Sequence, residues 1–111
     1  MANPFEGTPV WVHGDIAADN LIIRNNRLYG IIDFGTCGVG DPSCDLVMAW
    51  NFFDRESRHI FLQEMQADPG MIARARGWAL WKALITLVAE DSAAEQRDWA
   101  TRVIAALLEE N

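Results

Sequence analysis

Two kinds of hydrophobic pattern follow one another along the chain, and the change falls near residue 41. Before that point the apolar residues form three short runs rich in β-branched side chains, at residues 10–12, 21–24 and 27–32. Such runs, when bounded by Gly, Asn and Asp, predict strands. Asn25-Asn26 separates the last two runs, and Asn tolerates the positive φ of a two-residue hairpin turn. We therefore predict a short buried strand, followed by an antiparallel hairpin over about residues 21–33.

The segments around these strands are expected to be loops. Residues 1–9 contain two prolines and a glycine, which is typical of an irregular lead-in. Glycines at positions 35, 38 and 40 predict a bend between the hairpin and the first helix.

Beyond residue 41 the apolar residues recur every three or four positions, which predicts helices. Three helices are each preceded by an aspartate that can cap free backbone N–H groups, namely Asp41, Asp54 and Asp68. Ser92 and Glu95 have the spacing of a capping box before a fourth helix. The first three helices are expected to end near Phe53, Met65 and Glu90. The whole chain is therefore predicted to be α+β and mainly helical.

The apolar positions of these helices predict the core. The stretch from Trp78 to Val88 is apolar nearly all round, so its helix is expected to be central. Helical spacing assigns the tryptophans at positions 50, 78, 81 and 99 to core packing rather than to a ligand cage. The other side chains expected in the core are Leu46, Ala49, Phe53, Ile60, Phe61, Met65, Val103, Ile104, Leu107 and Leu108.

Polar side chains gather in the loop before the hairpin. Asp15 and Asn20 lie in one loop, and Asp33 follows the second hairpin strand. Because a hairpin returns the chain to its starting point, we expect Asp33 to arrive close to Asn20. Two carboxylates and an amide supply the oxygen ligands that Mg²⁺ prefers. The sequence therefore predicts a site for a hard cation here.

These residues resemble the paired loops of the kinase superfamily. His13-Gly14-Asp15 with Asn20, then Asp33-Phe34-Gly35, then Gly40-Asp41-Pro42 with Asp45 are similar to the aminoglycoside phosphotransferase and small-molecule kinase family. The resemblance spans residues 10 to about 50. It implies that Asp15 is the catalytic aspartate, that Asn20 and Asp33 are Mg²⁺ ligands, and that His13 and Asp45 support the loop.

The resemblance also implies a substrate, a nucleotide cofactor and a nucleotide-binding lobe that precedes these residues in the family. It implies transfer of phosphate from ATP, or another nucleoside triphosphate, to a hydroxyl of a small molecule such as an aminoglycoside, a reaction associated with antibiotic resistance. The upstream nucleotide-binding lobe is expected to be absent, because the only lysine, Lys82, is far downstream of the phosphate-binding lysine of the family. The 111 residues are thus expected to be one partial domain, a C-terminal lobe that is inactive alone and could form homo-oligomers through exposed apolar surface.

Composition narrows the class of partner. Nine basic and sixteen acidic residues give a formal net charge of −7, so nucleic acid is not expected as a partner. Such a surface would attract a cationic acceptor, although acidity can also serve solubility alone. The start of the chain lacks the pattern of a signal peptide and no run is long enough to span a membrane, which predicts a cytoplasmic protein. The two cysteines, Cys37 and Cys44, predict neither a zinc site nor a disulfide.

Two other functions fit parts of the pattern. One is a metal-dependent hydrolase in which His13, Asp15 and Asp33 bind the metal, and it requires His13 to point into the metal site. The other is a non-catalytic interaction module, a kinase-like lobe whose apolar side binds a partner chain.

Overall fold

The computed structural model of the protein describes residues 4–109, and these residues have mixed α and β structure. The regular elements, in chain order, are β1 (Val10–Val12), the 3₁₀ helix η1 (Ala18–Asn20), β2 (Leu21–Arg24), β3 (Arg27–Ile31), β4 (Gly38–Gly40), the 3₁₀ helix η2 (Pro42–Leu46), α1 (Met48–Asn51), α2 (Arg55–Glu64), α3 (Pro69–Val88) and α4 (Ala94–Glu109). The predicted α+β class is confirmed. Residues 4–9 of the expected lead-in form neither helix nor strand, and residues 1–3 lie outside the described part.

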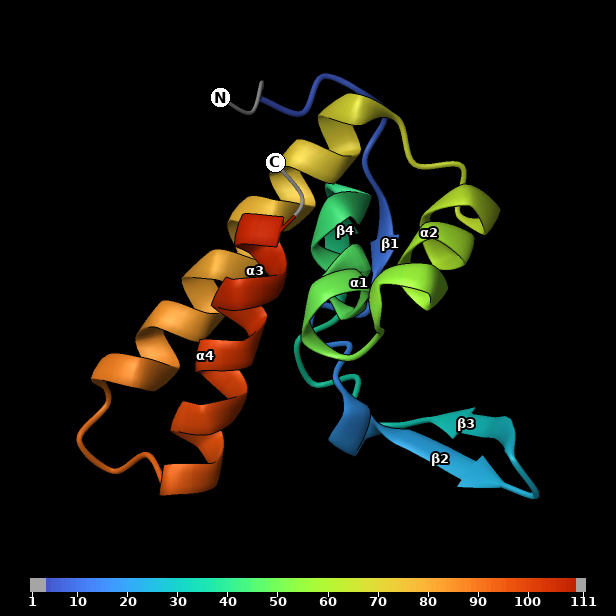
Figure 1. Cartoon of the computed structure of the whole chain (residues 1–111). Helices are drawn as coiled ribbons and strands as arrows, with labels where there is room; N and C mark the ends of the chain where they lie inside the picture. Colours follow the sequence, from blue (N-terminus) through green and yellow to red (C-terminus); the bar gives the residue numbers. More distant parts are fainter. Residues whose placement is uncertain (1–3, 110–111) are drawn as a thin grey trace.

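The predicted hairpin is confirmed. Strands β2 and β3 pair antiparallel, with Leu21 opposite Ile31 and Arg24 opposite Arg27. The turn residues Asn25 and Asn26 both have a positive φ, the left-handed conformation that this type of turn requires. In Figure 1 the hairpin projects away from the helices, so its two ends, rather than its strands, meet the rest of the molecule.

A second sheet forms where a bend was expected. Strand β4 pairs antiparallel with β1, and Trp11 lies opposite Val39. The prediction of an irregular bend over residues 35–40 was wrong for its second half. The prediction that β1 is buried was also wrong, because Trp11 is 77% exposed and Val10 is 43% exposed. These two side chains belong to a sheet of only two strands, and the described part of the chain leaves them at the surface.

The aspartate caps are confirmed at all three predicted positions. Asp41, Asp54 and Asp68 each accept a hydrogen bond from a backbone N–H group in the first turn that follows. The predicted capping box at Ser92 is wrong. The Ser92 hydroxyl donates to the carbonyl of Thr86 at 2.7 Å, and the side chain of Gln96 accepts the N–H of Ala93. Ser92 therefore closes the end of α3 instead of starting α4.

The first predicted helix is broken into two pieces, η2 and α1. Its start is a 3₁₀ helix, and α1 ends at Asn51 because Phe52 has non-helical backbone angles. The indole N–H of Trp99 donates to the carbonyl of Asn51 at 3.0 Å. This bond satisfies a backbone carbonyl that would accept a helical hydrogen bond if α1 continued. Phe53 consequently lies beyond the helix and is half-buried rather than buried.

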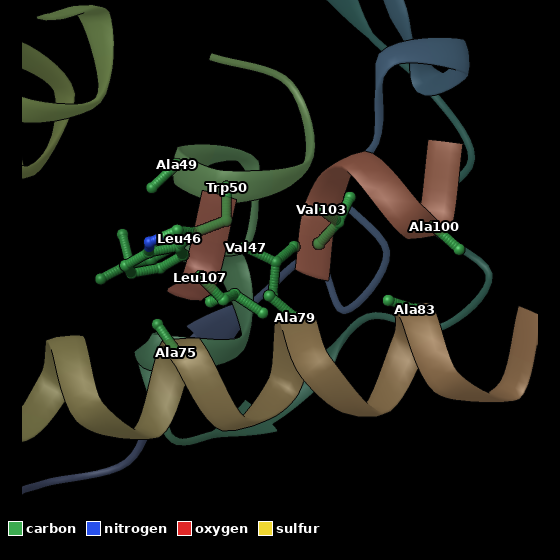
Figure 2. Close-up of a cluster of buried hydrophobic side chains, with 10 residues drawn as sticks. All are labelled: Leu46, Val47, Ala49, Trp50, Ala75, Ala79, Ala83, Ala100, Val103 and Leu107. Carbon is green, nitrogen blue, oxygen red and sulfur yellow. The ribbon is translucent and has the colours of Figure 1, made fainter. Parts of the chain in front are cut away.

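The core is formed where η2, α1, α3 and α4 meet. Alanines at positions 75, 79 and 83 occupy one face of α3 at helical spacing, and all three are buried. Figure 2 shows these alanines facing the larger side chains of the cluster, including Leu46, Val47 and Leu107. Small residues on one helix let the neighbouring elements approach closely, so this stripe fixes the position of α3.

Several predicted core residues are exposed. Ile60 of α2, Met65 directly after α2 and Leu108 of α4 are at least half exposed, whereas Phe61 and Ile104 are half-buried against the core. Helix α3 packs against η2, α1 and α4, as expected of a central helix, but it is buried only along its alanine stripe and leaves many of its other apolar side chains outside. These exposed side chains of α3 are Trp78, Leu80, Trp81, Leu84, Ile85 and Val88. Of the four tryptophans assigned to the core, only Trp50 is buried, and Trp99 is half-buried.

The described helices are all too short or too polar to cross a membrane. The cysteines of this part, Cys37 and Cys44, are both free thiols.

Candidate active site

The loop after β1 is shaped by a glycine. Gly14 has φ of +90°, a conformation that other residues rarely adopt. A Cβ at this position would lie 2.5 Å from the carbonyl oxygen of Thr36. The loop therefore passes directly against the segment that follows the hairpin, and only glycine allows this approach.

Asp45 holds the same loop from the side of η2. One carboxylate oxygen accepts the N–H of His13 at 2.8 Å, and the other accepts the N–H of Gly14 at 2.9 Å. Hydrogen bonds to a charged acceptor are among the stronger ones in proteins. Asp45 thus fixes the backbone that carries the next residue, Asp15.

His13 ties the loop to the end of the hairpin. Its ring is buried, its Nδ1 accepts the N–H of Asp15, and its Nε2 donates to the carbonyl of Ile32 at 2.8 Å. This pattern places the ring proton on Nε2. Phe34 packs edge-on against the ring, with 4.5 Å between ring centroids.

The two nitrogens of His13 are therefore occupied within the loop. A metal-dependent hydrolase would need one of them as a ligand. Among residues 4–109, moreover, there is no group of three or more His, Cys, Asp or Glu side chains that could hold a metal ion. The geometry does not support the hydrolase hypothesis.

Asn20 contacts Asp15 directly. It is buried at the end of η1, and its amide nitrogen donates to the Asp15 carbonyl at 2.8 Å and to Asp15 Oδ2 at 3.3 Å. Because the nitrogen is used in this way, the side-chain oxygen of Asn20 is the atom that can bind a cation.

Asp33 lies beside Asn20 in the fold. The N–H of Ile32 donates to the Asn20 carbonyl at 2.9 Å, so the hairpin returns the chain to Asn20 just before Asp33. Asp33 has a positive φ, which is uncommon for a residue other than glycine, and its side chain is exposed. Residues held in sparsely populated backbone conformations cluster at functional sites, so the backbone of Asp33 is consistent with a ligand-binding role.

The sequence did not reveal a fourth polar residue of the site. Lys82 of α3 places its ammonium 3.2 Å from Asp15 Oδ1, although the two residues are 67 positions apart. The pattern indicated only that Lys82 interrupts an apolar helix. A charged side chain in an otherwise apolar helix usually faces a partner of opposite charge, and this was the one signal in the sequence that a carboxylate lies near Lys82.

A pocket of about 310 Å³ adjoins this ion pair. Asp15 and Gly14 line it from the loop, and Trp78, Trp81 and Lys82 line it from α3. The two indoles meet edge to face, with 5.9 Å between ring centroids. The tryptophans predicted to be core residues thus form an aromatic wall next to Asp15.

Cys44 also lines the pocket, but as a neutral thiol. Burial raises its pKa to about 11, and the neighbouring charges of Asp45 and Asp41 act in the same direction. A thiol with this pKa is a weak nucleophile at neutral pH.

Asp41 joins the end of β4 to α3. Burial alone would raise the pKa of Asp41, but hydrogen bonds from Ser43 and the ion pair with Arg74 outweigh it and hold the pKa below its ordinary value. The Arg74 Nε atom lies 2.9 Å from Asp41 Oδ2. Asp41 is therefore a helix cap that also anchors α3, and so supports the wall of the pocket.

Residues 2–84 match the model of the phosphotransferase enzyme family. This chain belongs to that family. The matched residues include all four groups described above, Asp15, Asn20, Asp33 and Lys82.

Curated relatives are similar to the chain over part of its length. An aminoglycoside 3'-phosphotransferase from Escherichia coli is 44% identical over 48 residues, which cover 43% of this chain and 18% of that enzyme. An aminoglycoside 3'-phosphotransferase from Niallia circulans is 48% identical over 40 residues, covering 36% of this chain and 15% of that enzyme. The matched segments therefore cover less than a fifth of the length of these relatives.

Solved structures match nearly the whole chain. APH(2'')-IIa, in its complex with gentamicin, is 31% identical and has a TM-score of 0.59, with 95% of this chain and 37% of that chain covered. APH(2'')-Ib bound to ADP is 30% identical, with a TM-score of 0.58 and coverage of 93% and 37%. The fold of the chain is thus that of part of an aminoglycoside phosphotransferase.

Proposed function

We propose that this chain is the part of an ATP-dependent phosphotransferase that carries the catalytic aspartate, and that its acceptor is a hydroxyl of an aminoglycoside-like small molecule. One observation carries the proposal: the Asp15 carboxylate is held at both oxygens, by Asn20 and Lys82, at the wall of a pocket. Membership of the phosphotransferase family supports it, as does the likeness to APH(2'')-IIa, which was solved with gentamicin and with streptomycin and ATP.

Asp15 is the group that faces the acceptor in this proposal. Phosphoryl transfer has a loose transition state, so the protein mainly positions the nucleophile and neutralises charge. Asp15 accepts a hydrogen bond from the acceptor hydroxyl and takes its proton as the oxygen bonds to the γ-phosphorus. The bond from that phosphorus to the oxygen of the leaving ADP breaks in the same transfer.

Asn20 and Asp33 fit a magnesium ion. The side-chain oxygen of Asn20 and the exposed carboxylate of Asp33 are hard oxygen ligands, and magnesium commonly uses one or two such groups together with phosphate oxygens and water. When bound, Mg²⁺ supplies positive charge to the phosphate oxygens. The chain's own part is to present the two ligands from opposite ends of one hairpin, which the hydrogen bond from Ile32 to Asn20 brings together.

The acceptor side is expected to favour an amine-bearing molecule. The chain has a formal net charge of −7, and the pocket beside Asp15 has an aromatic wall made by Trp78 and Trp81. An aromatic face attracts cations when water is partly excluded. Both features favour a polycationic acceptor over a neutral sugar.

The test uses a hybrid enzyme, in which residues 4–109 replace the structurally equivalent segment of APH(2'')-IIa. We expect the hybrid to phosphorylate gentamicin with ATP and Mg²⁺, and the 111-residue chain alone to transfer phosphate poorly or not at all. Asp15→Asn should lower kcat of the hybrid by roughly 10²- to 10⁴-fold, the usual range for loss of a general base. Asp19→Asn, in the neighbouring η1 and exposed, is the matched control and should leave kcat nearly unchanged.

Retained phosphate transfer in the Asp15→Asn hybrid would overturn the proposal. A measurement on the chain itself guards against a hybrid that fails to fold. Addition of Mg²⁺ and ATP should change the tryptophan fluorescence of the wild-type chain, and Asp33→Asn should weaken that response. A response unaffected by Asp33→Asn would contradict the assigned metal ligands.

A second candidate is an interaction module that binds a partner through apolar surface. Exposed large apolar side chains favour it, including Trp11, Val39 and Val88. Exposed patches of this kind commonly mark interfaces. Titration with Mg²⁺ and ATP distinguishes the candidates, because the interaction module predicts no change in tryptophan fluorescence, together with a stable oligomer in sedimentation.

A further inference from the structure

The ion pair between Lys82 and Asp15 lies outside the sequence motifs that identified the rest of the site. Lys82 is the only lysine of the sequence. Its ammonium lies 3.2 Å from Asp15 Oδ1, and its side chain is 29% exposed. Both residues line the 310 Å³ pocket, so the pair lies where an acceptor would bind.

The two oxygens of the Asp15 carboxylate are held by different groups. Asn20 donates to Oδ2, and Lys82 donates to Oδ1. The Asn20 contact is long, at 3.3 Å, and it comes from a side chain of the same loop. Without Lys82 the carboxylate could turn about its Cβ–Cγ bond and lose its direction towards the pocket.

Lys82 is carried by a rigid part of the molecule. The neighbouring residues Ala79 and Ala83 are buried in the core, so the backbone of α3 is fixed at this point (Figure 2). Catalytic geometry is held best by side chains on packed helices. Because α3 is fixed by the core, Lys82 holds the Asp15 carboxylate in a fixed position relative to that core.

We infer that Lys82 is a positioning residue for Asp15 in phosphoryl transfer, an inference that rests on the proposed function. The ammonium keeps the carboxylate directed at the acceptor hydroxyl. Its positive charge also offsets the repulsion between that carboxylate and the phosphate oxygens that must approach it. An ion pair this exposed contributes little to stability, so its loss should act on catalysis and not on folding.

The pairing is tested first on the 111-residue chain. Reductive methylation with ¹³C-formaldehyde labels Lys82 and keeps its charge, and the absence of the signal in Lys82→Arg assigns it. We expect Asp15→Asn to shift the methyl resonance and Asp19→Asn to leave it in place. Equal spectra for the two variants would overturn the pairing, whether or not the chain is a phosphotransferase.

The catalytic part is tested in the hybrid with APH(2'')-IIa. Lys82→Met should lower kcat about 10²-fold, the scale of a small misplacement of a reacting group, while KM for gentamicin changes little. Lys82→Arg keeps the charge and should recover most of kcat, which a purely structural role would not predict. An unchanged or raised kcat in Lys82→Met would overturn the inference. A folded wild-type hybrid without activity would instead overturn the proposed function, and the resonance test would still decide the pairing.

Discussion

Buried side chains differ in kind between the two halves of the molecule. Among residues 4–45 the buried ones are His13, Asn20 and Ser43, all polar. Among residues 46–109 they are apolar, with Arg58 as the exception. The first half is therefore shaped by hydrogen bonds and backbone geometry, whereas the second is shaped by packing.

The difference indicates how the site is built. A loop held by directional hydrogen bonds can place Asp15, Asn20 and Asp33 without a core of its own, but it needs a rigid support. The helical half supplies that support through η2, where Asp45 faces the loop and Leu46 faces the core. Substitution of these two neighbours separates the two kinds of stabilisation.

The largest effect is expected from the core side of η2. Leu46 is 1% exposed. Leu46→Ala should lower the free energy of unfolding by about 3 kcal/mol, the usual cost of such a cavity. Urea unfolding followed by tryptophan fluorescence measures it. Leu84→Ala removes a side chain that is 45% exposed and is the control, expected to cost much less. Equal costs would show that the buried Leu46 contributes no more to stability than an exposed leucine.

On the loop side of η2, the loss of stability should depend on how many acceptor oxygens remain at position 45. Asp45→Ala leaves the N–H groups of His13 and Gly14 without their acceptor. Loss of a partner for such groups should lower the free energy of unfolding by about 1–3 kcal/mol. Asp45→Asn keeps one acceptor oxygen and should cost about half as much. If both variants unfolded like the wild type in urea, the loop would not depend on hydrogen bonds from η2.

Features set by residues close together in the sequence could be predicted from it. The hairpin turn at Asn25-Asn26 and the three aspartate caps were predicted correctly, because each depends on the chemistry of a few neighbouring residues. The motif also named the residues His13, Asp15, Asn20 and Asp45, which hydrogen bonds bring together in the loop.

Long-range contacts were not predictable in this way. The pairing of β4 with β1 joins residues far apart in the sequence, and two of the three β4 residues are glycines, which give no strand signal. The apolar pattern of α3 does not reveal which side the core will cover, so Trp78 and Trp81 were assigned to the wrong surroundings. The contact of Lys82 with Asp15 depends on that same packing.

A third prediction concerns backbone geometry in the polar half. Gly14→Ala places a Cβ against the Thr36 carbonyl in a positive-φ conformation. A left-handed conformation costs a residue with a Cβ about 1–2 kcal/mol, and the contact with the Thr36 carbonyl adds to this, so we expect the unfolding free energy to fall by at least this amount. Gly38→Ala is the matched control, since its Cβ would meet nothing within 4 Å. Urea titration of the pair should separate their midpoints. Coincident curves would mean that the close approach of the two segments does not constrain the loop.

The smallest effect is expected where the two halves are joined by Asp41 and Arg74. The folded protein holds the pKa of Asp41 below its ordinary value of 3.8, so the unfolded chain binds this proton more readily. The stabilisation is therefore present above that value and is lost as the pH falls through the lower, folded pKa. In Asp41→Asn the fall in stability on acidification from about pH 5 should be shallower than in the wild type. Thermal unfolding across that pH range measures the difference.

Arg74→Met separates the ion pair from the cap at the same residue. It removes one of the groups that lower the pKa of Asp41 and should flatten the pH dependence of stability only in part, because the hydrogen bonds from Ser43 to Asp41 remain. Asp41→Asn removes the titrating group itself and should therefore flatten it more. A wild-type slope in both variants would mean that titration of Asp41 does not contribute to the pH dependence of stability.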